Sequence, residues 1–224
     1  KKIDQTSAGI PVLSRPKDKV VEPDKIASLE ALLPTLQGHR VVYVGEQHDQ
    51  YAHHMNQLKV IKKLHEAGIQ LAVGMEMFQL SYQEAIDDYM SGRTDERQFL
   101  KASAYFDKWG FDYTLYKPII DYLKKEKIPL VALNIDGSIS RKVARKGLGA
   151  LSEEEKKQIP PEMDFTDSDY QRDLFKIFDF HDNEHQLNTF DLFLEAQVLW
   201  DETRAESGHR DLARHPDRAR VGLA

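Results

Sequence analysis

The stretch VVYVGEQHDQYAHHMNQLKVI, Val41 to Ile61, decides how this chain folds. Its first four residues are apolar and β-prone, which is typical of a strand buried on both faces. A glycine and a polar run follow, and from about Asp49 the apolar residues recur at the spacing of a helix. A buried strand that leads directly into a helix begins a strand–helix–strand unit. The stretch therefore predicts a parallel sheet.

The same alternation of strand and helix patterns continues along the chain. Leu71–Met77 and Leu130–Asn134 are two more buried strand candidates, and Arg220–Ala224 begins a fourth. The apolar spacing predicts helices at 25–36, 49–67, 81–90, 94–104, 111–127 and 188–213. We therefore predict an α/β fold, with a parallel β-sheet flanked by helices and right-handed crossovers.

Residues 140–185 differ in character from the rest of the chain. Glycines and prolines interrupt short polar helical pieces, and no strand-like run occurs there. We predict a small all-helical insert subdomain at 140–185. The sheet domain then comprises residues 1–139 and 186–224.

Composition excludes several classes of function. The chain has 224 residues, enough for one substantial core, and its formal net charge of -6 gives no positive field for nucleic acid. It has no cysteine, which excludes disulfides, thiolate metal sites and a cysteine nucleophile. No window approaches the roughly 18 apolar residues that a membrane span needs. The sequence starts at Lys1 without a methionine or a signal segment, as expected of a mature or trimmed chain.

Acidic and imidazole side chains follow the first two predicted strands. Glu46 and His48 end the first, and Glu76 lies at the end of the second. The carboxyl ends of parallel strands share one edge of the sheet, where ligands bind. Such groups ligate a divalent cation or act as general acid and base. Glu46, His48 and Glu76 are therefore a candidate metal or catalytic site, and the alternative is that they only anchor loops. For Asp49 we expect a helix N-cap.

Five motifs, in order along the chain, resemble the ChaN family of iron-regulated, haem-binding lipoproteins of bacteria. They span about Val41 to Glu206. The motifs are Val41–Asp49 with His54, Val73–Phe78, Leu115–Ile119, Pro129–Asn134, and Ala196-Gln197 with Trp200–Thr203.

The resemblance implies a parallel sheet with a small helical domain, and a haem-binding protein rather than an enzyme. It implies haem between two subunits, with tyrosine on the iron and a histidine and a lysine on the propionates. The implied role is haem-iron acquisition in the bacterial cell envelope, as an outer-membrane lipoprotein or a periplasmic protein. A homodimer promoted by haem and an outer-membrane haem receptor are the implied partners.

Several residues are candidates for the haem site that the resemblance implies. Tyr116 lies in a matched motif, Tyr113 lies three residues before it, and Tyr170 lies in the insert beside acidic and basic neighbours. Each could instead be a buried core phenol. Residues expected near the propionates are Lys117, His54 and His181. His181 and His185 share a face if their helix is continuous, and could bind a metal.

The strand-end Gly-Glu-x-His more distantly resembles erythromycin-esterase-like and Tiki-like metal-dependent hydrolases. The alternative function is therefore a divalent-metal-dependent hydrolase that uses Glu46, His48 and Glu76. The sequence departs from the ChaN pattern at Arg204, where the family usually has methionine. The family also continues past the last strand to a histidine beyond the point at which this sequence ends.

Overall fold

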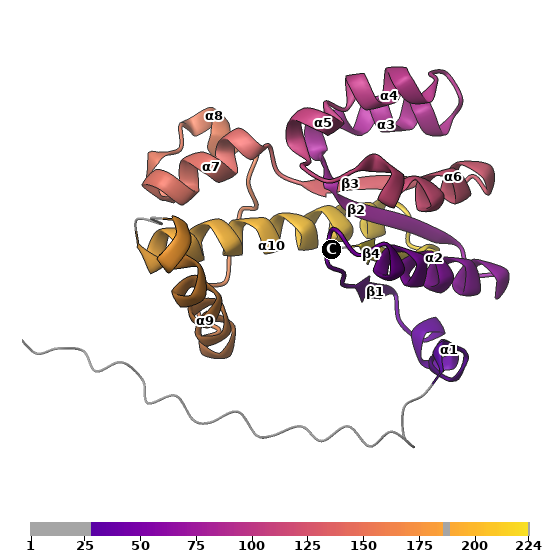
Figure 1. The fold of residues 1–224 in the computed structure, drawn as a ribbon, viewed down its shortest axis with the longest axis horizontal. Coiled ribbons are helices and arrows are strands. Elements are labelled where there is room, and N and C mark those ends of the chain that lie inside the picture. Colours follow the sequence, from indigo (N-terminus) through magenta and orange to yellow (C-terminus); the bar gives the residue numbers. More distant parts are fainter. Residues whose placement is uncertain (1–27, 186–188, 224) are drawn as a thin grey trace, which may run out of the picture.

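The computed structural model describes residues 28–185 and 189–223. At its centre is a four-stranded parallel sheet in the order β1-β4-β2-β3 (Figure 1). The strands are β1 (Val41–Val44), β2 (Leu71–Gln79), β3 (Leu130–Asn134) and β4 (Ala219–Leu223). The predicted parallel α/β fold is confirmed, and the fourth strand forms where the sequence pattern placed it.

The last strand of the chain lies inside the sheet rather than at its edge. In β4, Val221 is in register with Val42 of β1 and with Val73 of β2. Every position of β2 is buried, which explains the unbroken apolar run in its sequence. The carboxyl edge of the sheet therefore includes a strand from the end of the chain, which lies between β1 and β2.

Helices connect and flank the strands. They are α1 (Leu29–Gln37), α2 (Tyr51–Glu66), η2 (Leu80–Tyr82), α3 (Gln83–Met90), α4 (Glu96–Ala102), α5 (Tyr105–Lys108), η3 (Tyr113–Leu115), α6 (Lys117–Lys125), α7 (Gly137–Lys146), η4 (Leu148–Ala150), α8 (Glu153–Lys156), α9 (Ser168–His185) and α10 (Phe190–Arg214). Among the described residues, no helix is both long enough and apolar enough to span a bilayer.

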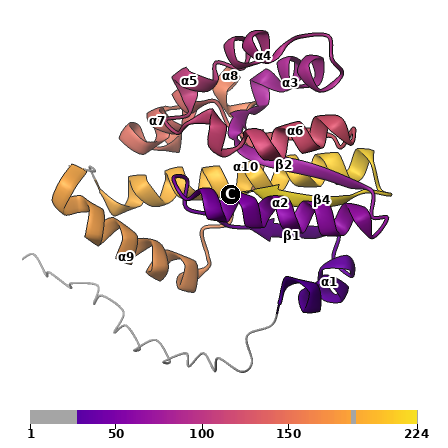
Figure 2. The ribbon, with the colours of Figure 1, turned by 45° about the vertical axis from the view of Figure 1, so that its right-hand side comes forward.

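The two faces of the sheet are covered differently. Helices α2 and α6 lie side by side on one face, as Figures 1 and 2 show, and bury Ile61 and Ile120 in the main core with Val73 of β2. The long helix α10 runs along the opposite face, where Leu133 of β3 lies directly over Gly74 of β2. Gly74 lets the leucine approach the sheet closely, since a Cβ there would clash with it.

A second apolar cluster lies beyond the carboxyl edge of the sheet. It joins Ile139 and Val143 of α7 to Ala196 and Leu199 in the first half of α10. Helices α7, α8 and α9 gather on this side of the molecule (Figure 1). Residues 140–185 form helices joined by loops and contain no strand. The division into a sheet domain and an insert subdomain stays a prediction.

The predicted helix at 111–127 is wrong in its first half. The segment forms η3 and then α6, which has a proline in its first turn and Tyr116 as its N-cap. Pro118 accounts for the break, because proline lacks the N–H that a helix interior needs but fits the first turn. As a result Tyr113 and Tyr116 do not share one helix face.

Candidate functional site

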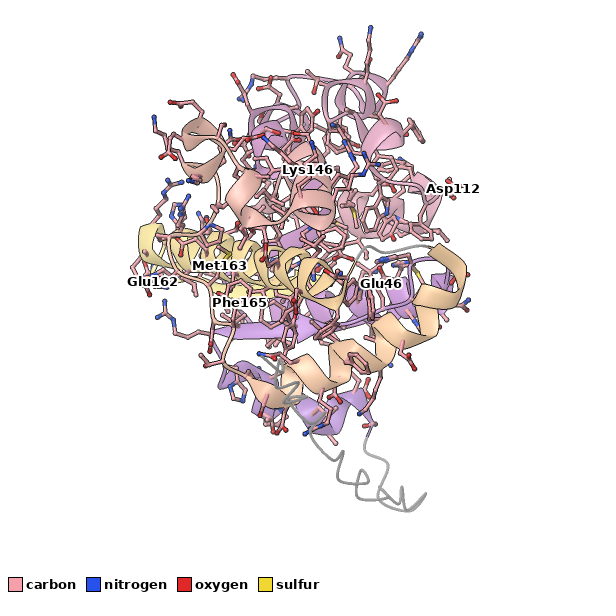
Figure 3. All side chains as sticks on the ribbon, turned by 90° about the vertical axis from the view of Figure 1, so that its left-hand side faces the viewer. Glu46, Asp112, Lys146, Glu162, Met163 and Phe165 are labelled. Atoms are coloured by element: carbon pink, nitrogen blue, oxygen red, sulfur yellow. The ribbon has the colours of Figure 1, made fainter. Side chains whose placement is uncertain are left out.

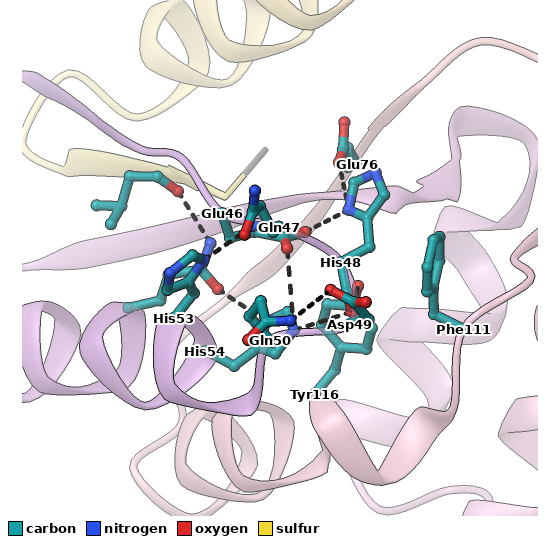
Figure 4. Close-up of polar contacts among 12 residues, drawn as sticks. Glu46, Gln47, His48, Asp49, Gln50, His53, His54, Glu76, Phe111 and Tyr116 are labelled. Carbon is teal, nitrogen blue, oxygen red and sulfur yellow. Dashed lines mark hydrogen bonds and ion pairs between the residues drawn. The ribbon is translucent and has the colours of Figure 1, made fainter.

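The first strand ends in a short bend that pairs a glutamate with a histidine. The Oε1 atom of Glu46 lies 2.5 Å from Nδ1 of His48 (Figure 4). The Glu46 side chain is 2% exposed, whereas the His48 side chain is 36% exposed. The buried carboxylate thus orients a histidine whose ring reaches the surface.

A bulge in β2 brings in the second glutamate. Pairing of β2 with β3 is regular up to Met75 and shifts before Gln79, so Glu76 lies where the ladder is interrupted. Such a bulge re-aims side chains. Asn134 of β3 donates from its side chain to the Glu76 carbonyl oxygen at 3.0 Å and holds the bulge in place. We predicted that the strand ends at Met77, but it continues to Gln79.

Glu46, His48 and Glu76 come together at the carboxyl edge of the sheet. One ligand atom from each lies within 4.8 Å of the other two, which is a spacing that a metal ion can bridge. Nδ1 of His48 is 3.7 Å from Oε1 of Glu76. Figure 3 looks at the molecule from the side at which the strands end, with Glu46 labelled. The structure thus brings together the three residues, and their chemical role stays a prediction.

Arg204 of α10 completes the cluster, and its place was not predicted. Its Nη2 atom is 2.5 Å from Oε2 of Glu76, and its side chain is only 18% exposed. Nη1 is 3.4 Å from Oδ1 of Asp201, one turn earlier in α10. The i, i+3 spacing of Asp201 and Arg204 was the available sequence signal, but it indicated only a local ion pair. The partner on β2 depends on how α10 packs against the sheet.

The electrostatics of the cluster are dominated by burial. Burial raises the pKa of the Glu76 carboxyl above its ordinary value, and Coulombic attraction to Arg204 and His48 opposes that rise. In the part of the chain that the structure describes, Oε2 of Glu46 and Oε1 of Glu76 have no hydrogen-bond partner. Two buried carboxylate oxygens without partners are costly, and a bound cation would satisfy them.

His54 lies behind Glu46 rather than at the surface. It is fully buried, with Nε2 3.2 Å from the His48 carbonyl oxygen and 3.9 Å from Oε2 of Glu46. Its Nδ1 is 3.4 Å from Oε1 of Gln57, whose amide donates to the Val44 carbonyl. His54 therefore braces the bend from inside. Its expected role at the propionates stays a prediction.

Asp49 does not cap the helix that follows it. The N-cap of α2 is Gln50, and no side chain accepts a hydrogen bond there. The Asp49 carboxylate instead accepts from the Gln50 side chain at 3.0 Å. The helix begins one residue later than the cap prediction requires, because His53 holds the bend by accepting from the Gln47 backbone at 3.0 Å.

Two aromatic side chains that sequence reasoning missed flank the exposed histidine. The ring centroids of Trp109 and Phe111 each lie 4.7 Å from that of His48. Both residues lie in the loop between α5 and η3, and nothing in their local sequence indicated contact with the first strand. They restrict the orientation of His48 and give the cluster an apolar wall.

The candidate tyrosines before α6 have separate environments. Tyr113 packs among Phe99 and Tyr105 in the main core. Tyr116 is 1% exposed, and its hydroxyl lies 3.4 Å from the His48 carbonyl oxygen, so it contacts the bend from the buried side. Burial raises the pKa of both phenols. Lys117 is paired with Glu96 and Asp121.

Tyr170 of α9 is the half-buried candidate. Its hydroxyl is 2.5 Å from Oδ2 of Asp201, and burial together with this hydrogen bond raises the pKa of the phenol. The other oxygen of Asp201 contacts Arg204, which contacts Glu76. Tyr170 is therefore linked to the cluster by side-chain contacts. The side chains of His181 and His185 lie outside the described residues.

A small hollow of about 20 Å³ between the sheet and α10 is lined by Arg204, Gly74 and Leu133 among others, and two larger hollows lie apart from the cluster. One of about 490 Å³ is lined by residues of α4 and α5 with the turn between them, and another of about 270 Å³ lies beside α10 at Glu202 and His209. Neither lining includes any of the three candidate tyrosines.

Comparison with known proteins gives one family and several fold relatives. The family described as haem-binding uptake, Tiki superfamily, ChaN matches residues 32–224. The curated protein RETICULATA-RELATED 5, chloroplastic, of Arabidopsis thaliana is 30% identical over 129 residues. That match covers 54% of this chain and only 17% of the length of the plant protein.

Solved structures share the fold at low sequence identity. ChaN of Campylobacter jejuni, whose structure is described as showing cofacial heme binding, superposes with a TM-score of 0.64 at 18% identity. The superposition covers 88% of this chain and 74% of that one. The erythromycin esterase EreC superposes with a TM-score of 0.50 at 15% identity, over 87% of this chain and 62% of the esterase. At these identities the structures show a common fold.

Proposed function

This chain belongs to the haem-binding uptake family of the Tiki superfamily, ChaN, and on that premise we propose that it binds haem through Tyr170 for haem-iron uptake. The match over residues 32–224, which includes both α9 and the carboxyl edge of the sheet, is the observation that carries the proposal.

The surroundings of Tyr170 support its assignment as the iron ligand. The phenol must lose its proton to bind ferric iron, and Asp201, 2.5 Å away, is an acceptor in place to take that proton. Ile177 lies seven residues further along α9, on the same helix face, and is 48% exposed. An apolar side chain on the same face suits contact with a porphyrin edge.

The other two tyrosines are less suited to the iron. Tyr113 and Tyr116 are 4% and 1% exposed, so either would have to leave the core to meet a ligand. Burial raises the pKa of Tyr170 as it does that of these two phenols, so accessibility rather than acidity distinguishes Tyr170. Tyr116 more simply supports the bend at His48.

Haem held by a tyrosinate gives a ferric centre suited to carrying haem rather than to electron transfer. The protein residues supply what this requires: Tyr170 as ligand, Asp201 as proton acceptor, and Arg204 behind Asp201 to hold it in place. His181 on the same helix and Lys117 remain the proposed partners of the propionates.

We further propose that two copies of this chain enclose the haem. The exposed apolar side chains of α9, Phe175 and Ile177, are available for a partner, and the C. jejuni protein is described as binding heme cofacially. We place the dimer in the bacterial cell envelope, as an outer-membrane lipoprotein or a periplasmic protein that passes haem to or from an outer-membrane receptor. Fractionation of cells with and without a lipid-modification inhibitor tests the location.

A hemin titration tests the proposal. Hemin added at micromolar concentration to the purified protein should produce a Soret band with tyrosinate-to-iron charge-transfer bands, and sedimentation should shift toward a dimer. Tyr170→Phe should weaken binding at least about tenfold, the scale expected for loss of a ligand bond. Tyr116→Phe is the matched control and should bind hemin like the wild type. The absence of any spectral change with wild-type protein would contradict haem binding.

A second function is favoured by the strand-end cluster. Glu46, His48 and Glu76 fit a divalent cation, because their ligand atoms converge within 4.8 Å and two carboxylate oxygens have no hydrogen-bond partner. A bound cation would supply an activated water for hydrolysis. Glu46, His48 and Glu76 would hold the ion, each through one ligand atom. This candidate predicts bound Mn²⁺ or Zn²⁺ by elemental analysis, and hydrolysis that disappears in Glu46→Ala.

A further inference from the structure

The strand-end cluster contains more negative charge than its own histidine can offset. Glu46 and Glu76 have side chains 2% and 6% exposed, so both carboxylates are removed from bulk water. Buried carboxylates require nearby positive charge or hydrogen-bond donors. Arg204 supplies that charge from the far side of Glu76, at 2.5 Å.

Arg204 is held in this position by its own neighbours. Asp201 contacts the guanidinium at 3.4 Å, and the guanidinium carbon lies 5.3 Å from the centre of the Trp200 ring. Tyr170 in turn donates to Asp201, which fixes the carboxylate that orients the arginine. These contacts, which come from α9 and α10, hold the guanidinium beside Glu76.

The arginine satisfies only one oxygen of the two carboxylates that face the cluster. Oε1 of Glu76 and Oε2 of Glu46 have no hydrogen-bond partner in the described part of the chain. These are the atoms that a divalent ion would bind, yet such an ion would share Glu76 with a guanidinium. Two cations on one carboxylate repel each other at a partly buried position, where screening is weak.

We infer that Arg204 is an internal competitor for the cation position, and that it sets the affinity of the cluster for divalent metal ions. The inference rests on the second proposed function, the metal site, and is independent of haem binding. Removing the charge of Arg204 should release Glu76 and strengthen metal binding. Keeping a charge at this position should keep metal binding weak.

Isothermal titration of the full chain with Mn²⁺ at neutral pH tests the inference. Arg204→Met removes the charge and retains an unbranched stem, and Arg204→Gln removes it while retaining a donor for Glu76. Both should bind Mn²⁺ at least about tenfold more tightly than the wild type. Arg204→Lys should bind like the wild type. The double variant Arg204→Gln with Glu76→Gln should lose the gain. Thermal unfolding identifies which variants are folded, and having two neutral variants protects the test against misfolding of either.

The Mn²⁺ titrations distinguish the competitor role of Arg204 from the metal site itself, and both from haem binding. If the wild type binds Mn²⁺ and folded neutral variants bind it no more tightly, the metal site stands and the competitor role is wrong. If no form binds Mn²⁺, both the metal site and the competitor role are wrong. The Soret titration reads haem binding separately, so neither result bears on Tyr170.

Discussion

Glu76 shows how one residue can depend on three parts of the fold. Its backbone lies in a bulge of β2, its carboxylate faces the first strand, and its counter-charge comes from α10. Burial raises its pKa despite the arginine 2.5 Å away. The Glu76 carboxylate is thus both buried and paired with an arginine.

The raised pKa of Glu76 predicts a pH-dependent stability. The folded protein holds the proton of Glu76 to higher pH than the unfolded chain, in which the carboxyl has its ordinary pKa of 4.5. The contribution to the free energy of unfolding is therefore fully present below about pH 4.5 and is lost as pH rises through the folded pKa. Urea unfolding at a series of pH values should show that wild type loses stability relative to Glu76→Gln as pH rises.

An exposed glutamate serves as the control for that measurement. Glu162 lies in a loop and is exposed, so Glu162→Gln should unfold in parallel with the wild type at every pH. If the difference in free energy of unfolding between wild type and Glu76→Gln stays constant, or changes in favour of the wild type as pH rises, the pKa of Glu76 is not raised by folding.

At the scale of elements, two glycines in the sheet let a side chain from the neighbouring strand pack directly over the backbone. A Cβ at Gly74 would meet the Leu133 side chain at 2.7 Å, and a Cβ at Gly222 would meet the Tyr43 ring at the same distance. Leu133 is buried, whereas Tyr43 is 59% exposed. The same clash would therefore occur at a buried side chain in one case and at an exposed side chain in the other.

The contrast predicts different costs for one substitution. Gly74→Ala should lower the free energy of unfolding by about 1–3 kcal/mol, because Leu133 is buried and can make room only by giving up part of its packing. Gly222→Ala should cost less than about 1 kcal/mol, because the exposed Tyr43 ring can swing away. Urea denaturation of the two variants measures both values. Equal costs would show that exposure of the overlying side chain is not what matters.

The strands and the outline of the site follow from local sequence, and their long-range partners do not. Val41–Val44 and the acidic groups after it predicted a strand and a strand-end cluster, because both signals lie within a few residues. The positions of Arg204, Trp109 and Phe111 depend on how distant segments pack, and periodicity cannot reveal that. The break before Pro118 could have been predicted from the sequence, since proline fits a helix in its first turn but not in its interior.

At the scale of the whole molecule, α9 and α10 connect the proposed haem ligand to the sheet. Tyr170, Asp201, Arg204 and Glu76 form one series of contacts from the helices to β2. The same side of the molecule carries the exposed apolar residues of α9. The proposed haem position, the dimer face and the strand-end cluster are therefore neighbours in a single region.

The proposed dimer face predicts the effect of one charge on assembly. Ile177→Asp should leave the fold intact, because the side chain is 48% exposed, and should abolish the shift toward dimer that hemin is expected to cause. Leu32→Asp, at a 46% exposed position on α1 at the other end of the molecule, is the control and should dimerise normally (Figure 1). Analytical ultracentrifugation with and without hemin measures both. Normal dimerisation of Ile177→Asp would place the interface elsewhere.

The identity of the iron ligand is tested most directly by resonance Raman spectroscopy of the ferric haem complex. Excitation within the tyrosinate-to-iron charge-transfer band should enhance phenolate vibrations in the wild type and in Tyr116→Phe. Those vibrations should be missing from Tyr170→Phe. Their persistence in Tyr170→Phe, or their absence from the wild type, would contradict tyrosinate ligation by α9.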